Sequence, residues 1–123
     1  MISVLIVDDE QAVRENLLAF LEDEGMQLSK AESGEEAVER VRTSCDFDVC
    51  VMDIRLPGMD GNATVVAMHA LQPQLLFLVH TGSSNYALPP ELRAIGMTHE
   101  HVFMKPLADM GVLADAIRKV SGR

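Results

Sequence analysis

Basic residues are scarce in this chain of 123 residues, which has 10 Lys and Arg against 19 Asp and Glu and a formal net charge of −9. Binding to nucleic-acid phosphates requires clustered lysine and arginine, so their shortage argues against that class of protein. It argues equally against docking on an anionic membrane surface. The charge therefore excludes classes of partner without naming one.

Long apolar segments are also missing. The longest runs, such as Leu75–Val79, are far shorter than the roughly 20 residues that span a bilayer. The first residues, Met1–Val7, lack the basic start of a secretory signal and lead directly into acids. Hydrophobic residues make up 48% of the chain, which allows a real core and excludes global disorder. We therefore expect one cytoplasmic domain at 1–123, with no linker to a second.

Cysteine is rare as well, and Cys45 and Cys50 are the two in the chain. Nothing else suggests a secreted protein, so the simpler interpretation is a small buried hydrophobe and an incidental thiol. A disulfide or a metal pair is the alternative, and the sequence leaves it open.

Four short apolar runs are nearly continuous rather than alternating, which is typical of strands covered on both faces of a parallel sheet. They are Ile2–Val7, Val49–Met52, Leu75–Val79 and Val102–Met104, and a weaker strand is expected at Met26–Ala31. Amphipathic helical patterns separate these runs. Strand and helix thus alternate five times, which predicts an α/β doubly wound sheet with helices on both faces.

The predicted helices have recognisable start signals. Ser33–Glu36 matches a capping box, and Asp60 can cap the next helix. The segment Ser83–Gly96 differs, because Pro89 and Pro90 interrupt any helix that runs through it. Pro90 fits best as the first residue of a short helix, so we expect the fourth helix to be shortened.

Polar residues lie where four of the predicted strands end. The strand ends carry, in chain order, Asp8-Asp9-Glu10, Asp53, Thr81 and Lys105-Pro106. In a doubly wound sheet the carboxyl ends of the strands form the ligand site, so we expect these residues to converge. Carboxylates about 4 Å apart repel by roughly 4 kcal/mol near a protein surface. A hard, partly hydrated cation such as Mg²⁺ offsets that repulsion.

Magnesium next to a carboxylate at a strand tip indicates phosphoryl chemistry. An aspartate can act as a nucleophile and form an acyl phosphate. A lysine then supplies positive charge, and a threonine supplies a hydroxyl donor, for the transferring oxygens. Asp53, Lys105 and Thr81 are the candidates for these three roles.

Four segments together resemble one family, the receiver domain of two-component response regulators. They are Val7–Glu10, Asp53–Gly61, Thr81 and Lys105-Pro106, and the resemblance extends over essentially the whole chain. Each motif alone is weak, but their order and their places at strand ends are very specific. The resemblance implies a flavodoxin-like sheet of five parallel strands in the order 2-1-3-4-5.

The resemblance also implies roles for individual acids. Asp53 would accept a phosphoryl group from the phosphohistidine of a sensor histidine kinase or a histidine phosphotransfer protein. Asp9 and Asp53 would ligate Mg²⁺ directly, together with the backbone carbonyl of Arg55. Asp8 would act on the metal mostly through water.

Lys105 and Thr81 would complete such a site. By the resemblance, Lys105 pairs with one phosphoryl oxygen, Thr81 shifts to bond another, and the Lys105–Pro106 bond is cis. The chain would catalyse only its own phosphorylation and dephosphorylation, and would not be an enzyme for other substrates. Its output partner would be a downstream protein or a fused output domain, with a homodimer as a further option.

Two departures from the family pattern concern its output. The family usually has Tyr or Phe three residues before the lysine, where this chain has Val102. Phe103 is adjacent, but neighbouring residues of a strand point to opposite faces. Because of Val102, we do not expect the usual threonine–aromatic coupling. Because Pro89 and Pro90 shorten the fourth helix, we also do not expect the usual output surface.

Two other functions stay open at this point. A vestigial receiver would bind proteins without being phosphorylated. A Mg²⁺-dependent phosphohydrolase of the haloacid-dehalogenase type would turn over a phosphate ester, but it places two aspartates one residue apart after its first strand. Asp8 and Asp9 are adjacent here, and the candidate nucleophile Asp53 follows the third strand.

Overall fold

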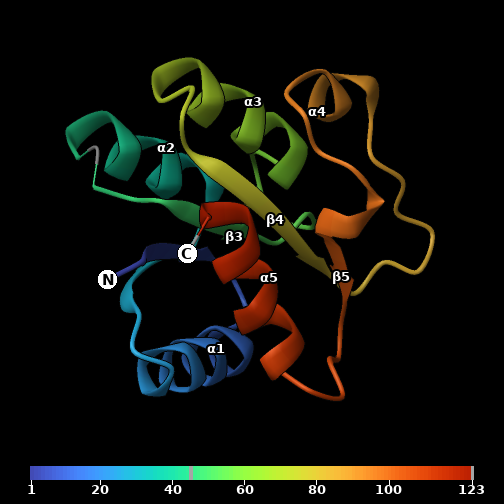
Figure 1. Ribbon diagram of the computed structural model, residues 1–123. Coiled ribbons are helices and arrows are strands. Elements are labelled where there is room, and N and C mark those ends of the chain that lie inside the picture. Colours follow the sequence, from blue (N-terminus) through green and yellow to red (C-terminus); the bar gives the residue numbers. More distant parts are fainter. Residues whose placement is uncertain (45, 123) are drawn as a thin grey trace.

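The computed structural model describes residues 1–44 and 46–122, so the prediction for Cys45 lies outside the described residues. Figure 1 shows strands and helices that alternate along the chain. In the described part of the chain, no helix is long and apolar enough to cross a membrane. The elements are β1 (Ser3–Val7), α1 (Gln11–Asp23), β2 (Gln27–Ala31), α2 (Gly34–Thr43), β3 (Val49–Met52), α3 (Gly61–Leu71), β4 (Leu76–Thr81), α4 (Pro90–Ala94), a 3₁₀ turn (His99–His101), β5 (Val102–Met104) and α5 (Gly111–Ser121).

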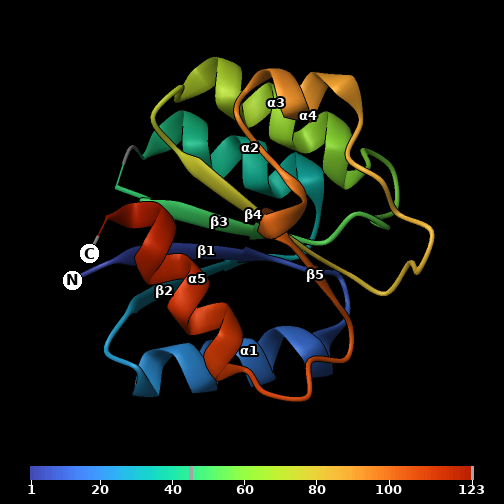
Figure 2. The same ribbon diagram turned by 45° about the vertical axis from the view of Figure 1, so that its right-hand side comes forward.

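The strands form one parallel sheet in the order β2-β1-β3-β4-β5. The predicted doubly wound sheet of order 2-1-3-4-5 is therefore confirmed. Helices α2, α3 and α4 cover one face of the sheet, and α1 and α5 cover the other (Figures 1 and 2). Because both faces are covered, residues that point to either face must be apolar, and the sequences of the central strands are therefore continuous apolar runs.

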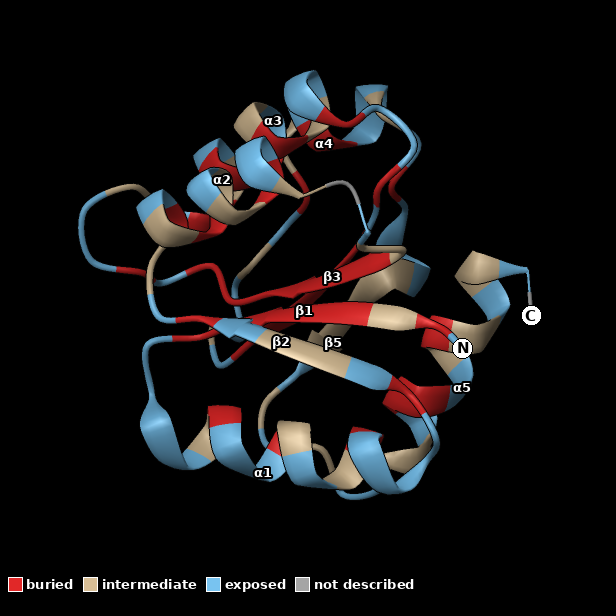
Figure 3. Cartoon of the chain, turned by 90° about the vertical axis from the view of Figure 1, so that its left-hand side faces the viewer, coloured by how far each residue is buried: buried red, intermediate tan, exposed pale blue. Residues whose placement is uncertain are grey.

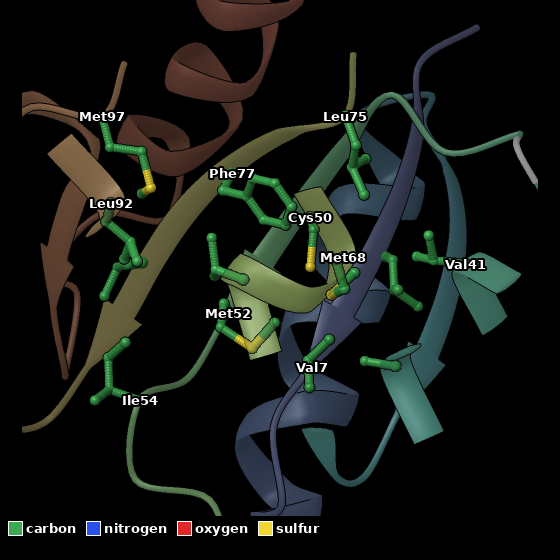
Figure 4. Packing of buried hydrophobic residues seen from close by; sticks show 14 of the residues in the cluster. Val7, Val41, Cys50, Met52, Ile54, Met68, Leu75, Phe77, Leu92 and Met97 are labelled. Carbon is green, nitrogen blue, oxygen red and sulfur yellow. The ribbon is translucent and has the colours of Figure 1, made fainter. Parts of the chain in front are cut away.

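Two hydrophobic clusters fill the space between the sheet and its helices. Cys50 and Met52 of β3 belong to the cluster beneath α2, α3 and α4, whereas Val49 and Val51 belong to the cluster on the side of α1 and α5. Figure 4 shows the first cluster, with Phe77 beside Cys50. The central strands are buried while the outer surfaces of the helices are exposed (Figure 3). Cys50 is a buried free thiol, and burial raises the pKa of that thiol.

The predicted helix starts are present, with one difference in detail. Ser33 Oγ accepts a hydrogen bond from the amide of Glu36 (3.1 Å), and Asp60 Oδ1 accepts one from the amide of Ala63 (2.8 Å). The Glu36 carboxylate accepts from the amide of Glu32 (2.7 Å) rather than from that of Ser33. The second half of the capping box therefore closes one residue earlier than the motif predicts, and it still satisfies a backbone donor.

The parallel register brings the carboxyl ends of the strands to one edge of the sheet. Val7 lies beside Met52, and the amide of Asp53 donates to the Val7 carbonyl (2.9 Å). At the other end of the edge, the amide of Lys105 donates to the Thr81 carbonyl (2.8 Å). These backbone bonds hold the segments that follow the strands in fixed positions.

The segment around α4 and β5 departs from the family pattern as the sequence predicts. Helix α4 has five residues and begins at Pro90. Val102 packs against the cluster beneath α2, α3 and α4, whereas Phe103 packs against the opposite cluster. The aromatic ring of Phe103 therefore lies on the other face of the sheet from α4.

Candidate phosphoryl and metal site

Lys105 is the centre of the group of polar side chains at this edge. Its Nζ lies 2.8 Å from Asp8 Oδ2, 3.2 Å from Glu10 Oε1 and 3.4 Å from Asp53 Oδ2. The lysine side chain is 12% exposed, and those of Asp8 and Asp53 are 2% and 5% exposed. Ion pairs that are this well shielded from water interact much more strongly than surface pairs.

Asp8 is held by hydrogen bonds on every side. Its amide donates to the Ala31 carbonyl (3.2 Å), and its Oδ1 accepts from the amide of Glu10 (2.9 Å). Its Oδ2 accepts the short bond from Lys105. Asp8 therefore links the end of β1 to the first turn of α1 and to the segment after β5.

Asp53 has an unusually high affinity for protons. Burial, and secondly the charge of Asp8, raise the pKa of its carboxyl from 3.8 to about 6, against the opposing charge and hydrogen bond of Lys105. Near neutral pH and without metal, Asp53 is mostly a carboxylate in an environment that disfavours the charge. A bound cation or a covalent bond to one oxygen would relieve this.

Lys105 responds in the complementary way. Burial alone would lower its pKa, but the hydrogen bond that Lys105 donates to Asp8, the charges of Asp53 and Asp8, and a further bond that Lys105 donates to Glu10 leave the pKa above its ordinary value. Lys105 therefore stays protonated at neutral pH. It offers a fixed positive charge to any anion that reaches Asp53.

The acids form a suitable donor set for a divalent cation. In the described chain, Asp8, Glu10 and Asp53 each offer a carboxylate oxygen within 4.8 Å of the others. Such oxygen donors suit Mg²⁺, which binds through a few carboxylates and keeps several waters. The exposed Asp9 is outside this group, and Arg55 is exposed beyond Asp53. Direct ligation by Asp9 and by the Arg55 carbonyl stays a prediction.

Thr81 is fully buried at the end of β4. Its hydroxyl oxygen accepts a hydrogen bond from the amide of Ser83 (3.1 Å), which orients the hydroxyl group. The hydroxyl proton is thereby left for another acceptor. The Lys105–Pro106 bond is cis, as the resemblance implies.

Two residues of this site were not assigned by the sequence analysis. Glu10 appears in the motif after the first strand, but the sequence does not show that it, rather than Asp9, faces Lys105. Arg14 is 3% exposed, on the same buried face of α1 as Leu17 and Leu21. The sequence did contain a signal for the burial of Arg14, because it lies three residues before Leu17 and therefore on the same apolar face of the helix.

The raised pKa of Asp53 predicts how stability depends on pH when EDTA is present. The folded state binds this proton more tightly than the unfolded state, so stability falls as pH rises from about 4 to about 6. Replacing Asp53 by Asn should therefore stabilise the protein at pH 7.5 by about 1–3 kcal/mol. Urea unfolding of both proteins from pH 4.5 to 7.5 measures this. A gap between them that does not widen with pH would contradict it.

Comparisons with known proteins identify a family. The model of the response regulator receiver domain family matches residues 4–118. Sporulation initiation phosphotransferase F of Bacillus subtilis is 30% identical over 117 residues, which cover 94% of this chain and 90% of the relative. The chain spans less than a third of the length of several other curated relatives that it matches.

Solved structures show the same fold. A receiver domain protein from Methanospirillum hungatei has a TM-score of 0.85 and 26% identity, with 99% of this chain and 94% of that one covered. The response regulator TrrA of Thermotoga maritima, in complex with Mg²⁺ and BeF, has a TM-score of 0.84 and 25% identity, with 98% and 99% covered. Fold, strand-end residues and family model coincide, and the chain therefore belongs to the family of response regulator receiver domains.

Proposed function

We propose that Asp53 is the residue of this receiver domain that accepts a phosphoryl group, and that the chain works as one receiver unit. The observation that supports this most directly is the buried Asp53 carboxylate 3.4 Å from Lys105 Nζ, within a group of three acids. No other part of the described chain combines a shielded carboxylate, a paired lysine and neighbouring acids in this way.

In this reaction one Asp53 oxygen bonds to the phosphorus of the donor. The bond between phosphorus and the leaving group breaks, and its electron pair leaves with the imidazole or the acetate. Asp53 must be ionised to attack, and its raised pKa keeps its carboxylate basic for an aspartate. The product is an acyl phosphate on Asp53.

Lys105 and Thr81 act on the transferred group. The ammonium of Lys105 already lies beside the Asp53 oxygen and can pair with a phosphoryl oxygen without a large movement. To do so it must weaken its bonds to Asp8 and Glu10. The Thr81 hydroxyl, oriented by the Ser83 amide, can donate to a second phosphoryl oxygen.

Magnesium fits the acids that surround Asp53. When bound, Mg²⁺ would neutralise charge on the carboxylates and on the transferring oxygens. Asp8, Asp9 and Asp53 would hold it, with the Arg55 carbonyl, and Glu10 is close enough to take part. The relative TrrA was solved with Mg²⁺ and BeF, which agrees with this assignment.

The donor that we propose is a phosphohistidine, carried by a sensor histidine kinase or a histidine phosphotransfer protein. The chain would catalyse its own phosphorylation and dephosphorylation and would not turn over a separate substrate. The output would reach a downstream protein or a fused output domain, since several relatives are much longer than this chain. We place this reaction in the cytoplasm.

The proposal is tested by incubating the protein with acetyl phosphate and following its intact mass. With Mg²⁺ we expect one added phosphoryl group per chain, and with excess EDTA we expect almost none, because the acids around Asp53 would then repel the anionic donor. Labelling that is equally fast in EDTA would contradict the metal site. No labelling under any condition would favour a vestigial receiver that binds proteins without phosphorylation.

A further inference from the structure

Arg14 is a buried cation beside the acidic site, on a helix face that is otherwise apolar. It is 3% exposed and shares the buried face of α1 with Leu17 and Leu21. Burying a guanidinium is unfavourable unless it is paired and hydrogen-bonded. A well-packed hydrophobic side chain would often serve stability at least as well there, so the position of Arg14 calls for another reason.

Arg14 donates two hydrogen bonds, one of them to the segment Asp8–Glu10 after β1, which we call the acidic loop. Nη1 donates to the backbone carbonyl of Asp8 (2.9 Å), and Nη2 donates to Glu32 Oε1 (3.0 Å). The Arg14 Nε is buried and has no partner in the described chain, so this position leaves one donor of the guanidinium unsatisfied. Its best-shielded contact is the bond to Asp8.

This bond completes the anchoring of the Asp8 backbone. The amide of Asp8 donates to the Ala31 carbonyl, and the carbonyl of Asp8 accepts from Arg14, so the peptide groups on both sides of its Cα are held. The Asp8 side chain is thereby directed at Lys105 and at the amide of Glu10. A connected path of contacts runs from the exposed Glu32 through Arg14 and Asp8 to Lys105.

We propose that Arg14 is a positioning residue for the phosphoryl site, which holds the acidic loop in the geometry that binds the divalent cation. This inference rests on the metal site of the proposed function. Groups that orient metal-binding residues typically change metal affinity by about 10-fold to 100-fold when they are removed. Arg14 itself touches neither the cation nor the transferred group.

The direction of the effect separates positioning from simple electrostatics. Removing a positive charge from beside three acids would, by charge alone, strengthen the binding of Mg²⁺. Losing the anchor of the Asp8 carbonyl would weaken it. A general loss of packing would lower the unfolding temperature but would leave the Mg²⁺ affinity of the protein that remains folded unchanged.

The experiment titrates MgCl₂ into the unphosphorylated chain by calorimetry, with circular dichroism to confirm folding. Arg14→Met keeps an unbranched apolar stem that can pack on the buried face of α1 and removes the donors, and we expect about tenfold weaker binding. Arg14→Lys keeps the charge and can reach one acceptor, so an intermediate affinity is expected. Glu32→Gln is the matched control, because it removes the exposed ion pair and leaves the bond to Asp8; its affinity should stay within about threefold.

A second readout comes from labelling with acetyl phosphate at increasing Mg²⁺. In Arg14→Met the Mg²⁺ concentration for half-maximal rate should rise about tenfold, while the rate at saturating Mg²⁺ recovers most of the wild-type value. If Arg14→Met does not fold, Arg14→Gln, which keeps one donor group (its amide NH₂), is judged by the same criteria. A folded variant that binds Mg²⁺ as tightly as wild type, or more tightly, overturns the role of Arg14 alone. Absence of binding by the wild type overturns the metal site as well.

Discussion

Replacing Asp53 by asparagine should abolish labelling by acetyl phosphate and Mg²⁺. The amide of asparagine has nearly the shape of the carboxyl group, but it lacks the anionic oxygen that attacks phosphorus. We expect the initial rate to fall by on the order of a hundredfold or more. Intact-mass measurement over time detects the added phosphoryl group without assuming its position.

The control for this variant is Asp115→Asn, which makes the same chemical change at a side chain that is 82% exposed on α5. It should be labelled at the wild-type rate. Asp53→Asn is also expected to be folded, and in EDTA more stable than wild type at pH 7.5, so loss of labelling cannot be attributed to unfolding. Undiminished labelling of Asp53→Asn would show that another residue accepts the phosphoryl group.

Replacing Gly61 by alanine should both destabilise the fold and slow phosphorylation. A Cβ at Gly61 would overlap the carbonyl oxygen of Asp53 and would lie 2.7 Å from the Cα of Ile54. Both are backbone atoms, so no side-chain rotation can relieve the contact. The start of α3 would have to move away from β3, although the amide of Gly61 now bonds to the Ile54 carbonyl (2.9 Å).

We expect this overpacking to cost about 3 kcal/mol of unfolding free energy, near the upper end of the usual range. Urea unfolding measures the loss, and labelling with acetyl phosphate at a temperature where the variant is folded measures the effect on Asp53. Gly25→Ala is the matched control. Gly25 has φ +86° and open space around its Cβ position, so its cost is backbone strain of about 1 kcal/mol.

The two glycine variants should also differ in function. Gly25 lies between α1 and the start of β2, whereas Asp53 follows the end of β3 at the opposite edge of the parallel sheet. Gly25→Ala should therefore be labelled at the wild-type rate. Gly61→Ala should be labelled more slowly, because the backbone of Asp53 itself must shift. Equal stability and equal labelling of the two variants would show that α3 can move freely with respect to the site.

The sequence by itself determined the fold and the edge at which the site lies. Continuous apolar runs separated by amphipathic helices are sufficient to indicate a covered parallel sheet, because these signals are local and repeat five times. The same holds for the shortened α4, since the ring of Pro90 restricts the backbone whatever surrounds it. Asp53, Thr81 and Lys105 could be assigned because each lies at the carboxyl end of a strand, Thr81 as its last residue and the other two directly after it.

Only the tertiary structure decided which side chains at that edge face one another. Asp8, Asp9 and Glu10 are consecutive, and the loop that joins β1 to α1 turns Asp8 and Glu10 toward Lys105 while Asp9 is exposed. The burial of Arg14, which lies on α1 but bonds to a backbone carbonyl at the end of β1, depends on how the helix packs.

The same reason explains the pKa of Asp53 and the close approach at Gly61. Burial and the charge of Asp8 raise that pKa to about 6, and both depend on contacts between segments that are far apart in the chain. Gly61 meets the Asp53 carbonyl only because α3 folds back onto the end of β3. Local patterns thus determined which elements form and where they end, whereas non-local packing decided the direction, the protonation and the spacing of the groups at the site.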